Sequence, residues 1–118
     1  MKPHILLPTP LRAITVLVVL CAAMARPAAG DEALNIVIAI KDHKFVPSEV
    51  TAPAGRKLKF TVRNEDSATS EFESSDFHRE KVVLAGGEIT VYVGPLDAGN
   101  YEFFDDFHPQ TRGHLLVK

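Results

Sequence analysis

Sulfur is scarce in this chain of 118 residues, which has one cysteine and two methionines. The chain also has no tryptophan. The cysteine is Cys21 and the methionines are Met1 and Met24, so every sulfur atom lies within the first 30 residues. If those residues are removed, the remainder can form no disulfide and can offer a metal neither a thiolate nor a thioether. A metal site there must use nitrogen and oxygen ligands.

The first 30 residues have the layout of a secretory signal peptide. Lys2 and Arg12 lie near the front, and the apolar run over residues 13–23 is followed by small residues. That run is about half as long as the roughly 20 residues that a membrane-spanning helix needs. We therefore expect a signal peptide at residues 1–30 and a secreted domain at residues 31–118.

The N-terminal segment allows three alternatives to cleavage after Gly30. Cleavage after Ala25 also follows small residues, but acidic, strand-like sequence begins directly after Gly30, which favours the later position. Cys21 raises the question of a lipoprotein anchor. The bulky Leu20 lies where a lipoprotein signal has a small residue, which argues against that anchor. A retained N-terminal anchor is the remaining alternative to cleavage.

Positive charge is also scarce in the expected domain. Removing Lys2, Arg12 and Arg26 from 13 basic residues leaves ten against 15 acidic residues, a formal charge of −5. This balance argues against a nucleic-acid partner, because nucleic-acid binding depends on a basic surface. The domain also has no G-x-S-x-G motif and no cysteine nucleophile, so a hydrolase finds little support. Ser70 or Ser74 near His108 is too weak a signal for a catalytic triad.

No segment keeps a helical period for more than two turns, whereas short β-branched or alternating segments recur about every 8–12 residues. Turn residues and prolines separate them. The expected strands cover residues 34–40, 45–51, 58–64, 71–73, 82–84, 88–93, 101–104 and 114–117. This pattern predicts an all-β, antiparallel Greek-key sandwich or a barrel of seven or eight short strands.

The strand that begins at Tyr101 ends in two adjacent aspartates. Turn residues precede Tyr101, which is the position where β-sandwiches often place a tyrosine that locks a corner. Alternation along the strand puts Phe103 and Asp105 on the core-facing side and Asp106 on the other side. His108 follows in the expected loop at 105–112. A carboxylate and an imidazole at the end of an apolar strand indicate a site for a hard or borderline metal ion.

Strand direction indicates which loops are neighbours. If successive strands alternate in direction, the loops at residues 41–45, 64–70 and 105–112 lie at one end of the sandwich. The candidate ligands at that end are His43, Glu71, Asp105, Asp106 and His108. Glu73 lies on the same side of its strand as Glu71 and is a further candidate. The alternative is that these are surface and turn residues, with Phe45, Phe60, Phe72, Phe103 and Tyr101 forming the core.

Three segments carry a family resemblance: F-V-P-S-E-V-T-A-P-A-G at 45–55, F-T-V-R-N at 60–64 and A-G-N-Y-E-F-F-D-D-F-H-P-Q-T-R-G at 98–113. The expected domain resembles the cupredoxins, which are Greek-key sandwiches with a copper site at one end. The resemblance places Ser70 at the first histidine ligand, Asp105 at the cysteine and Thr111 near the axial methionine. Only His108 is retained, so a blue-copper centre of two histidines and one cysteine is excluded.

Four further segments, at 41–45, 71–74, 79–83 and 103–109, resemble the small periplasmic cupredoxin-like proteins of bacterial ferrous-iron uptake operons. That resemblance implies a periplasmic protein that binds, or helps oxidise, iron or copper before transfer to an iron permease, alongside other periplasmic transport components. Imidazole and oxygen ligands suit Fe(II), Fe(III), Mn(II) or a non-blue Cu(II) ion. The alternatives are a periplasmic copper carrier, which would use the same residues, and a metal-free interaction module. A homodimer that forms around the metal is a further alternative.

Overall fold

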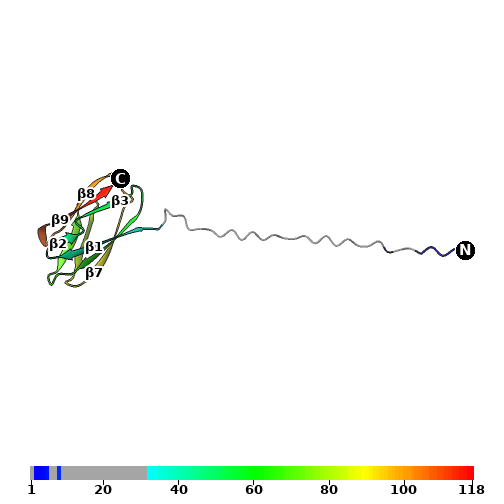
Figure 1. Cartoon of the computed structure of the whole chain (residues 1–118), viewed down its shortest axis with the longest axis horizontal. Coiled ribbons are helices and arrows are strands. Elements are labelled where there is room, and N and C mark those ends of the chain that lie inside the picture. The colour runs from blue at the N-terminus through cyan, green and yellow to red at the C-terminus, as the bar shows by residue number, and fades with distance from the viewer. Residues whose placement is uncertain (1, 6–7, 9–31) are drawn as a thin grey trace.

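The computed structural model describes residues 2–5, 8 and 32–118 (Figure 1). The expected signal peptide at residues 1–30, including Cys21, therefore lies almost entirely outside the described residues. In the described part of the chain, no helix is long and apolar enough to cross a membrane.

Residues 34–117 form nine strands in two sheets (Figure 1). The strands are β1 (Leu34–Lys41), β2 (Lys44–Val46), β3 (Glu49–Ala52), β4 (Leu58–Asn64), β5 (Ser70–Ser74), β6 (Arg79–Val83), β7 (Glu88–Val93), β8 (Gly99–Asp105) and β9 (His108–Val117). One sheet has the order β2-β1-β4-β7 and the other the order β3-β9-β8-β5-β6. The predicted all-β sandwich is confirmed. Each sheet also contains one parallel pair, β1 with β4 and β3 with β9.

Aromatic side chains fill the space between the sheets, where Phe60, Phe72 and Phe103 are fully buried. The ring centroids of Phe72 and Phe103 lie 5.5 Å apart, and Phe45 meets Phe103 edge to face at 4.9 Å. The predicted core is thus confirmed. Tyr101 packs against it, and its hydroxyl donates to the backbone oxygen of Asp97 at 2.8 Å, which is the expected corner contact.

The expected loop at 105–112 is instead a tight hairpin. Asp105 pairs with His108, so only Asp106 and Phe107 form the tip, and β9 begins at His108 rather than at residue 114. The carboxylate of Asp105 causes this, because its Oδ1 atom accepts the backbone N–H of Phe107 at 3.0 Å and closes the turn. His108 is therefore held on a strand end rather than on a long loop.

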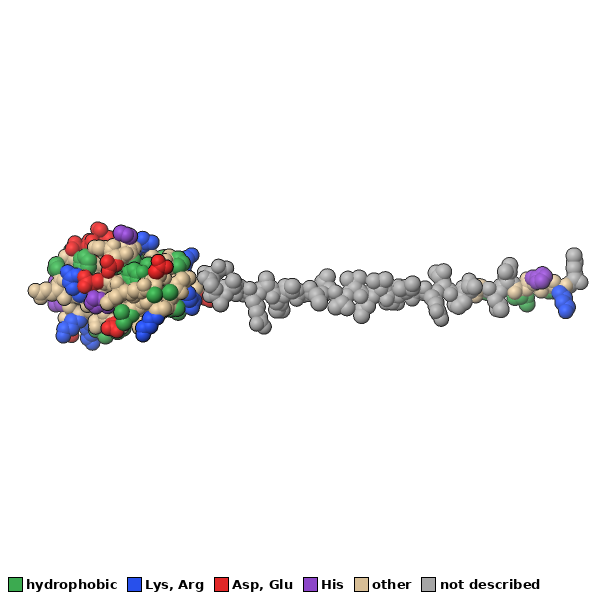
Figure 2. Space-filling model, turned by 90° about the horizontal axis from the view of Figure 1, so that it is seen from above, with side chains coloured by type: hydrophobic (Ala, Val, Ile, Leu, Met, Phe, Trp, Pro, Cys, Tyr) green, Lys and Arg blue, Asp and Glu red, His purple; other side chains and the backbone are tan. Residues whose placement is uncertain are grey.

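Alternation within β5 and β8 decides which polar groups are buried. Phe103 and Asp105 are fully buried on the inner face of β8, as predicted, and Asp106 is exposed. Glu71 and Glu73 lie half-buried on the outer face of β5. On the face shown in Figure 2, acidic and basic side chains are interspersed, and no continuous basic stripe is seen there.

Candidate metal centre

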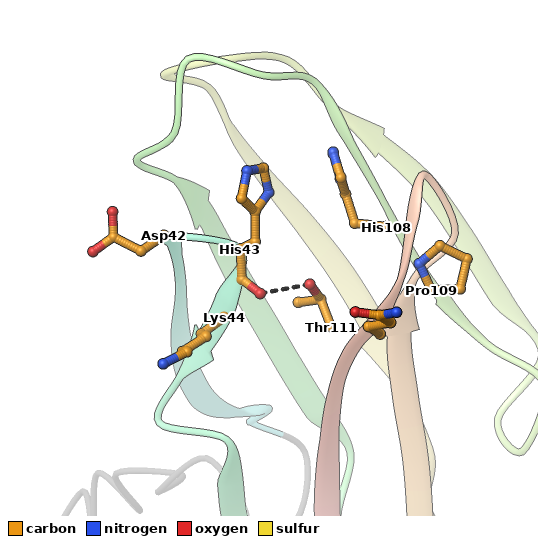
Figure 3. A pocket seen from close by; sticks show the side chains of 7 residues that line it. Asp42, His43, Lys44, His108, Pro109 and Thr111 are labelled. Atoms are coloured by element: carbon orange, nitrogen blue, oxygen red, sulfur yellow. Dashed lines mark hydrogen bonds between the residues drawn. The ribbon is translucent and has the colours of Figure 1, made fainter.

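The connections expected at one end of the sandwich do meet there. The rings of His43 and His108, from the β1–β2 turn and the start of β9, have centroids 4.5 Å apart with a 44° tilt. The hydroxyl of Thr111 donates to the backbone oxygen of His43 at 2.5 Å, which fixes the turn against β9 (Figure 3). Asp66, in the β4–β5 connection, accepts backbone hydrogen bonds from the same turn. The predicted convergence of these connections is confirmed.

An open pocket lies beside the two imidazoles (Figure 3). It is lined by Asp42, His43, Lys44, His108, Pro109, Gln110 and Thr111. Because both rings line it, a metal ion with water or small exogenous ligands can approach them from solvent.

His108 is oriented by a buried carboxylate. Its Nδ1 atom lies 2.9 Å from Oδ2 of Asp105, a residue with no solvent exposure. The other carboxylate oxygen, Oδ1, accepts the backbone N–H groups of Glu71 and Phe107, each at 3.0 Å. With Nδ1 held in this way, Nε2 is the ring nitrogen of His108 that remains for a metal.

The carboxylate of Asp105 stays ionised despite its burial. Burial raises the pKa of this group, but hydrogen bonds from Ser70, Glu71, His108 and Phe107 together outweigh the burial and hold its pKa below the ordinary value. Charge-assisted hydrogen bonds are strong, so the buried carboxylate fixes the positions of the groups that donate to it. The result is a rigid, negatively charged support behind the imidazole of His108.

Three further carboxylates gather on the outer face of the five-stranded sheet. Glu71, Glu73 and Asp106 each offer one oxygen atom, and these atoms lie within 4.8 Å of one another. Partial burial raises the pKa of Glu71, and the neighbouring charges of Glu80, Asp106 and Glu73 raise it further. Partial burial, with the charges of Asp106 and Glu80, likewise raises the pKa of Glu73. A bound cation would relieve this repulsion.

The five predicted ligands thus fall into two groups. His43, Asp105 and His108 lie on the pocket side, whereas Glu71 and Asp106 lie with Glu73 on the outer face. Among the described residues, the outer group is the only one in which three or more His, Cys, Asp or Glu side chains bring ligand atoms within 4.8 Å of one another. Glu73 is signalled in the sequence by its E-x-E spacing from Glu71. Nothing in the sequence signalled Asp66.

Comparison with known proteins supports the fold and the family. The family model described as a cupredoxin-like domain matches residues 13–117. The chain belongs to the cupredoxin-like domain family. An uncharacterized protein of Rickettsia prowazekii (strain Madrid E) is 44% identical over 89 residues, which cover 75% of this chain and 71% of that protein.

Several solved structures share the fold. The metal-binding domain of the Cu(I)-exporting P-type ATPase of Streptococcus pneumoniae D39, solved with Cu(I), has a TM-score of 0.66 at 15% identity, covering 79% of this chain and 91% of that chain. Auracyanin A, a blue copper protein of Chloroflexus aurantiacus, has a TM-score of 0.63 at 15% identity, covering 74% and 100%. Amicyanin of Paracoccus versutus has a TM-score of 0.58 at 21% identity, covering 80% and 86%. At these identities the likeness shows the fold.

This cupredoxin-like domain does not fit a blue-copper ion. Ser70, Asp105 and Thr111, at the positions where the resemblance places two ligands and the axial group, are all buried. Each is engaged inside the protein: Ser70 bonds to Asp105, and Thr111 donates to the backbone oxygen of His43. None of the three residues carries sulfur, so they offer no thiolate for the copper–sulfur bond that defines a blue-copper centre. The donor set fits an ion that accepts imidazole and oxygen.

Proposed function

We propose that this protein binds a metal cation through His43 and His108 and acts as a periplasmic accessory of iron uptake. In this role it binds iron or copper, and helps oxidise Fe(II), before the metal passes to a membrane permease. The observation that carries the proposal is the pair of imidazoles, 4.5 Å apart, of which one is oriented by the buried carboxylate of Asp105.

Asp105 acts in this proposal through His108. The sequence predicts Asp105 as a direct ligand, but its two oxygens already serve Glu71, Phe107 and His108. Metal-binding histidines commonly donate their second ring N–H to a carboxylate, which fixes the tautomer and makes the ligating nitrogen more basic. The 2.9 Å contact with Nδ1 supports that role for Asp105.

The outer carboxylates of Glu71, Glu73 and Asp106 provide a second set of metal-binding groups. The backbone N–H of Asp106 donates to the backbone oxygen of Glu71 at 2.9 Å, which holds these two residues together. Three carboxylates suit a hard cation, and they stabilise Fe(III) more than Fe(II) because attraction grows with the charge of the ion. Oxidation of Fe(II) here would need a one-electron oxidant from outside the protein, such as a Cu(II) ion, which becomes Cu(I) as Fe(II) becomes Fe(III).

The solved relatives favour copper as the competing metal. The ATPase domain was solved with Cu(I), and auracyanin A is a blue copper protein. At a site of nitrogen and oxygen donors, Cu(II) also binds more tightly than Fe(II). A copper carrier of another transport system would use the same residues, and comparing a deletion strain under iron-limited and copper-limited growth separates the two functions.

Metal titration of the purified protein tests the proposal. We expect His43→Ala and His108→Ala each to weaken Cu(II) or Fe(II) binding at least about 10-fold. His114→Ala is the matched control, because His114 lies farther along β9 and contacts Asn100 instead. Unchanged affinity in His108→Ala would discard the site. Elemental analysis and EPR of the protein isolated from its own cells measure the metal that it carries. The absence of both iron and copper would favour a metal-free interaction module.

A further inference from the structure

His43 lies in the left-handed backbone region, which residues other than glycine take only occasionally, although histidine does so more often than most. Lys41 pairs with Lys44, so Asp42 and His43 form a two-residue hairpin turn between β1 and β2. Their φ angles are 51° and 56°, and positive φ at both central residues is the mark of a type I′ turn. The second position of this turn strongly favours glycine, because a side chain in the left-handed region is strained. Surrounding contacts must therefore keep His43 in this conformation.

A carboxylate from a different loop holds this turn in place. Oδ1 of Asp66 accepts the backbone N–H of Asp42 at 2.7 Å, and Oδ2 accepts that of His43 at 3.0 Å. The side chain of Asp66 is only 11% exposed. Its own backbone N–H donates to Oδ1 of the buried Asn64 at 3.0 Å, which fixes the carboxylate in turn. Charge-assisted hydrogen bonds of this kind are stronger than those between neutral groups.

The turn is therefore held from two sides. Asp66 binds its N–H groups, and Thr111 binds the backbone oxygen of His43. Between these contacts the His43 ring lies against His108 and lines the pocket (Figure 3). Removing the contacts to Asp66 would let the turn relax toward less strained backbone angles and swing the imidazole away.

We propose that Asp66 is a positioning residue for the metal centre, which holds the strained turn so that the His43 ring stays against His108. The expected loss of metal affinity rests on the proposed function. The expected position of the His43 ring rests only on the contacts of Asp66 in the structure. Asp66 contacts the backbone N–H groups of residues 42 and 43, and its Oδ2 atom also lies 3.9 Å from Nδ1 of His43. Because both contacts act on His43, the effect of Asp66 on metal binding must disappear when the imidazole of His43 is absent.

Asp66→Asn is the test variant, because the amide keeps one acceptor oxygen and turns an NH₂ group toward the second backbone N–H. We expect the NOE between the ring protons of His43 and His108 to weaken in the metal-free protein, and Cu(II) affinity to fall about 10- to 100-fold. Asp76→Asn is the control, because Asp76 also accepts a backbone N–H, from Glu102 at 2.7 Å, in the β5–β6 connection.

His43→Gly provides the second background, in which the left-handed turn is no longer strained and the protein is expected to fold. There, adding Asp66→Asn should leave Cu(II) affinity unchanged. A wild-type NOE pattern in Asp66→Asn, or an equal loss of affinity with and without the His43 imidazole, would overturn the proposal. Wild-type protein that binds neither Cu(II) nor Fe(II) would instead overturn the proposed function, while the NOE would still decide the positioning of the ring.

Discussion

Replacing Asp105 by asparagine should leave the sandwich folded and yet remove most of its metal affinity. An asparagine whose oxygen takes the place of Oδ1 keeps the backbone hydrogen bonds from Glu71 and Phe107. Its NH₂ group then faces Nδ1 of His108, which must accept a hydrogen bond rather than donate one. The single ring proton of neutral His108 consequently moves to Nε2, the nitrogen that we propose for the metal.

The contacts of Asp105 set the size of each effect. Hydrogen bonds to a charged group contribute about 1.5–3 kcal/mol, so losing the charge while keeping the geometry should lower the free energy of unfolding by about 1–2 kcal/mol. Asp105→Ala removes the acceptor entirely and leaves buried donors without partners, each costing about 1–3 kcal/mol. The total loss for alanine should be on the order of 3–5 kcal/mol. Metal affinity should fall about 10- to 100-fold in Asp105→Asn.

Three measurements check this prediction. Urea unfolding of the metal-free proteins gives the two stability losses, Cu(II) titration gives the affinities, and imidazole ¹⁵N chemical shifts report which nitrogen of His108 carries the proton. The reasoning is refuted if Asp105→Asn binds Cu(II) as tightly as the wild type while Nε2 is protonated. Equal stability of the asparagine and alanine variants would show that the hydrogen bonds to Asp105 do not support the fold.

Gly113→Ala should lower the free energy of unfolding by about 1–3 kcal/mol or more, because its Cβ would lie 2.2 Å from Cε2 of Phe103. Urea unfolding measures this loss, and Gly99→Ala is the control because the nearest atom to its Cβ would be 3.4 Å away. Asp105 has a lowered pKa, so the stability that it provides is present above pH 3.8 and is lost as the pH falls through its folded-state pKa; acid unfolding of wild type against Asp105→Asn measures this. Glu71 has a raised pKa and acts in the opposite direction, since the folded state loses stability as the pH rises from 4.5 through the folded-state pKa. Metal-free Glu71→Gln should therefore be at least as stable as wild type at pH 7, and a lower unfolding midpoint would contradict the repulsion among the outer carboxylates.

Much of the arrangement could be predicted because it follows from strand geometry. Alternation along the strand that begins at Tyr101 placed Phe103 and Asp105 inside and Asp106 on the other side. The count of strand directions placed His43 and His108 at the same end, where their rings are in contact. The first argument uses the alternation of side chains along a strand, and the second uses the alternation of direction between successive strands. Both can be applied to a single sequence.

The remaining features depend on polar contacts that leave no periodic trace. The start of β9 at His108 follows from the turn closed by Asp105, and the conformation of the β1–β2 turn depends on Asp66. The division of the candidate ligands into two groups was implicit in the alternation, because it puts Asp105 on the core-facing side and the next residue, Asp106, on the other side.

Strand length is therefore constrained as firmly as composition around this hairpin. One peptide step separates a water-free, hydrogen-bonded Asp105 from a solvated Asp106. Deleting or inserting a single residue within Gly99–Asp105 would exchange the two environments, leaving the imidazole without its anion and the outer cluster without its third member. A change in the residue count of β8 must therefore be compensated before the hairpin tip.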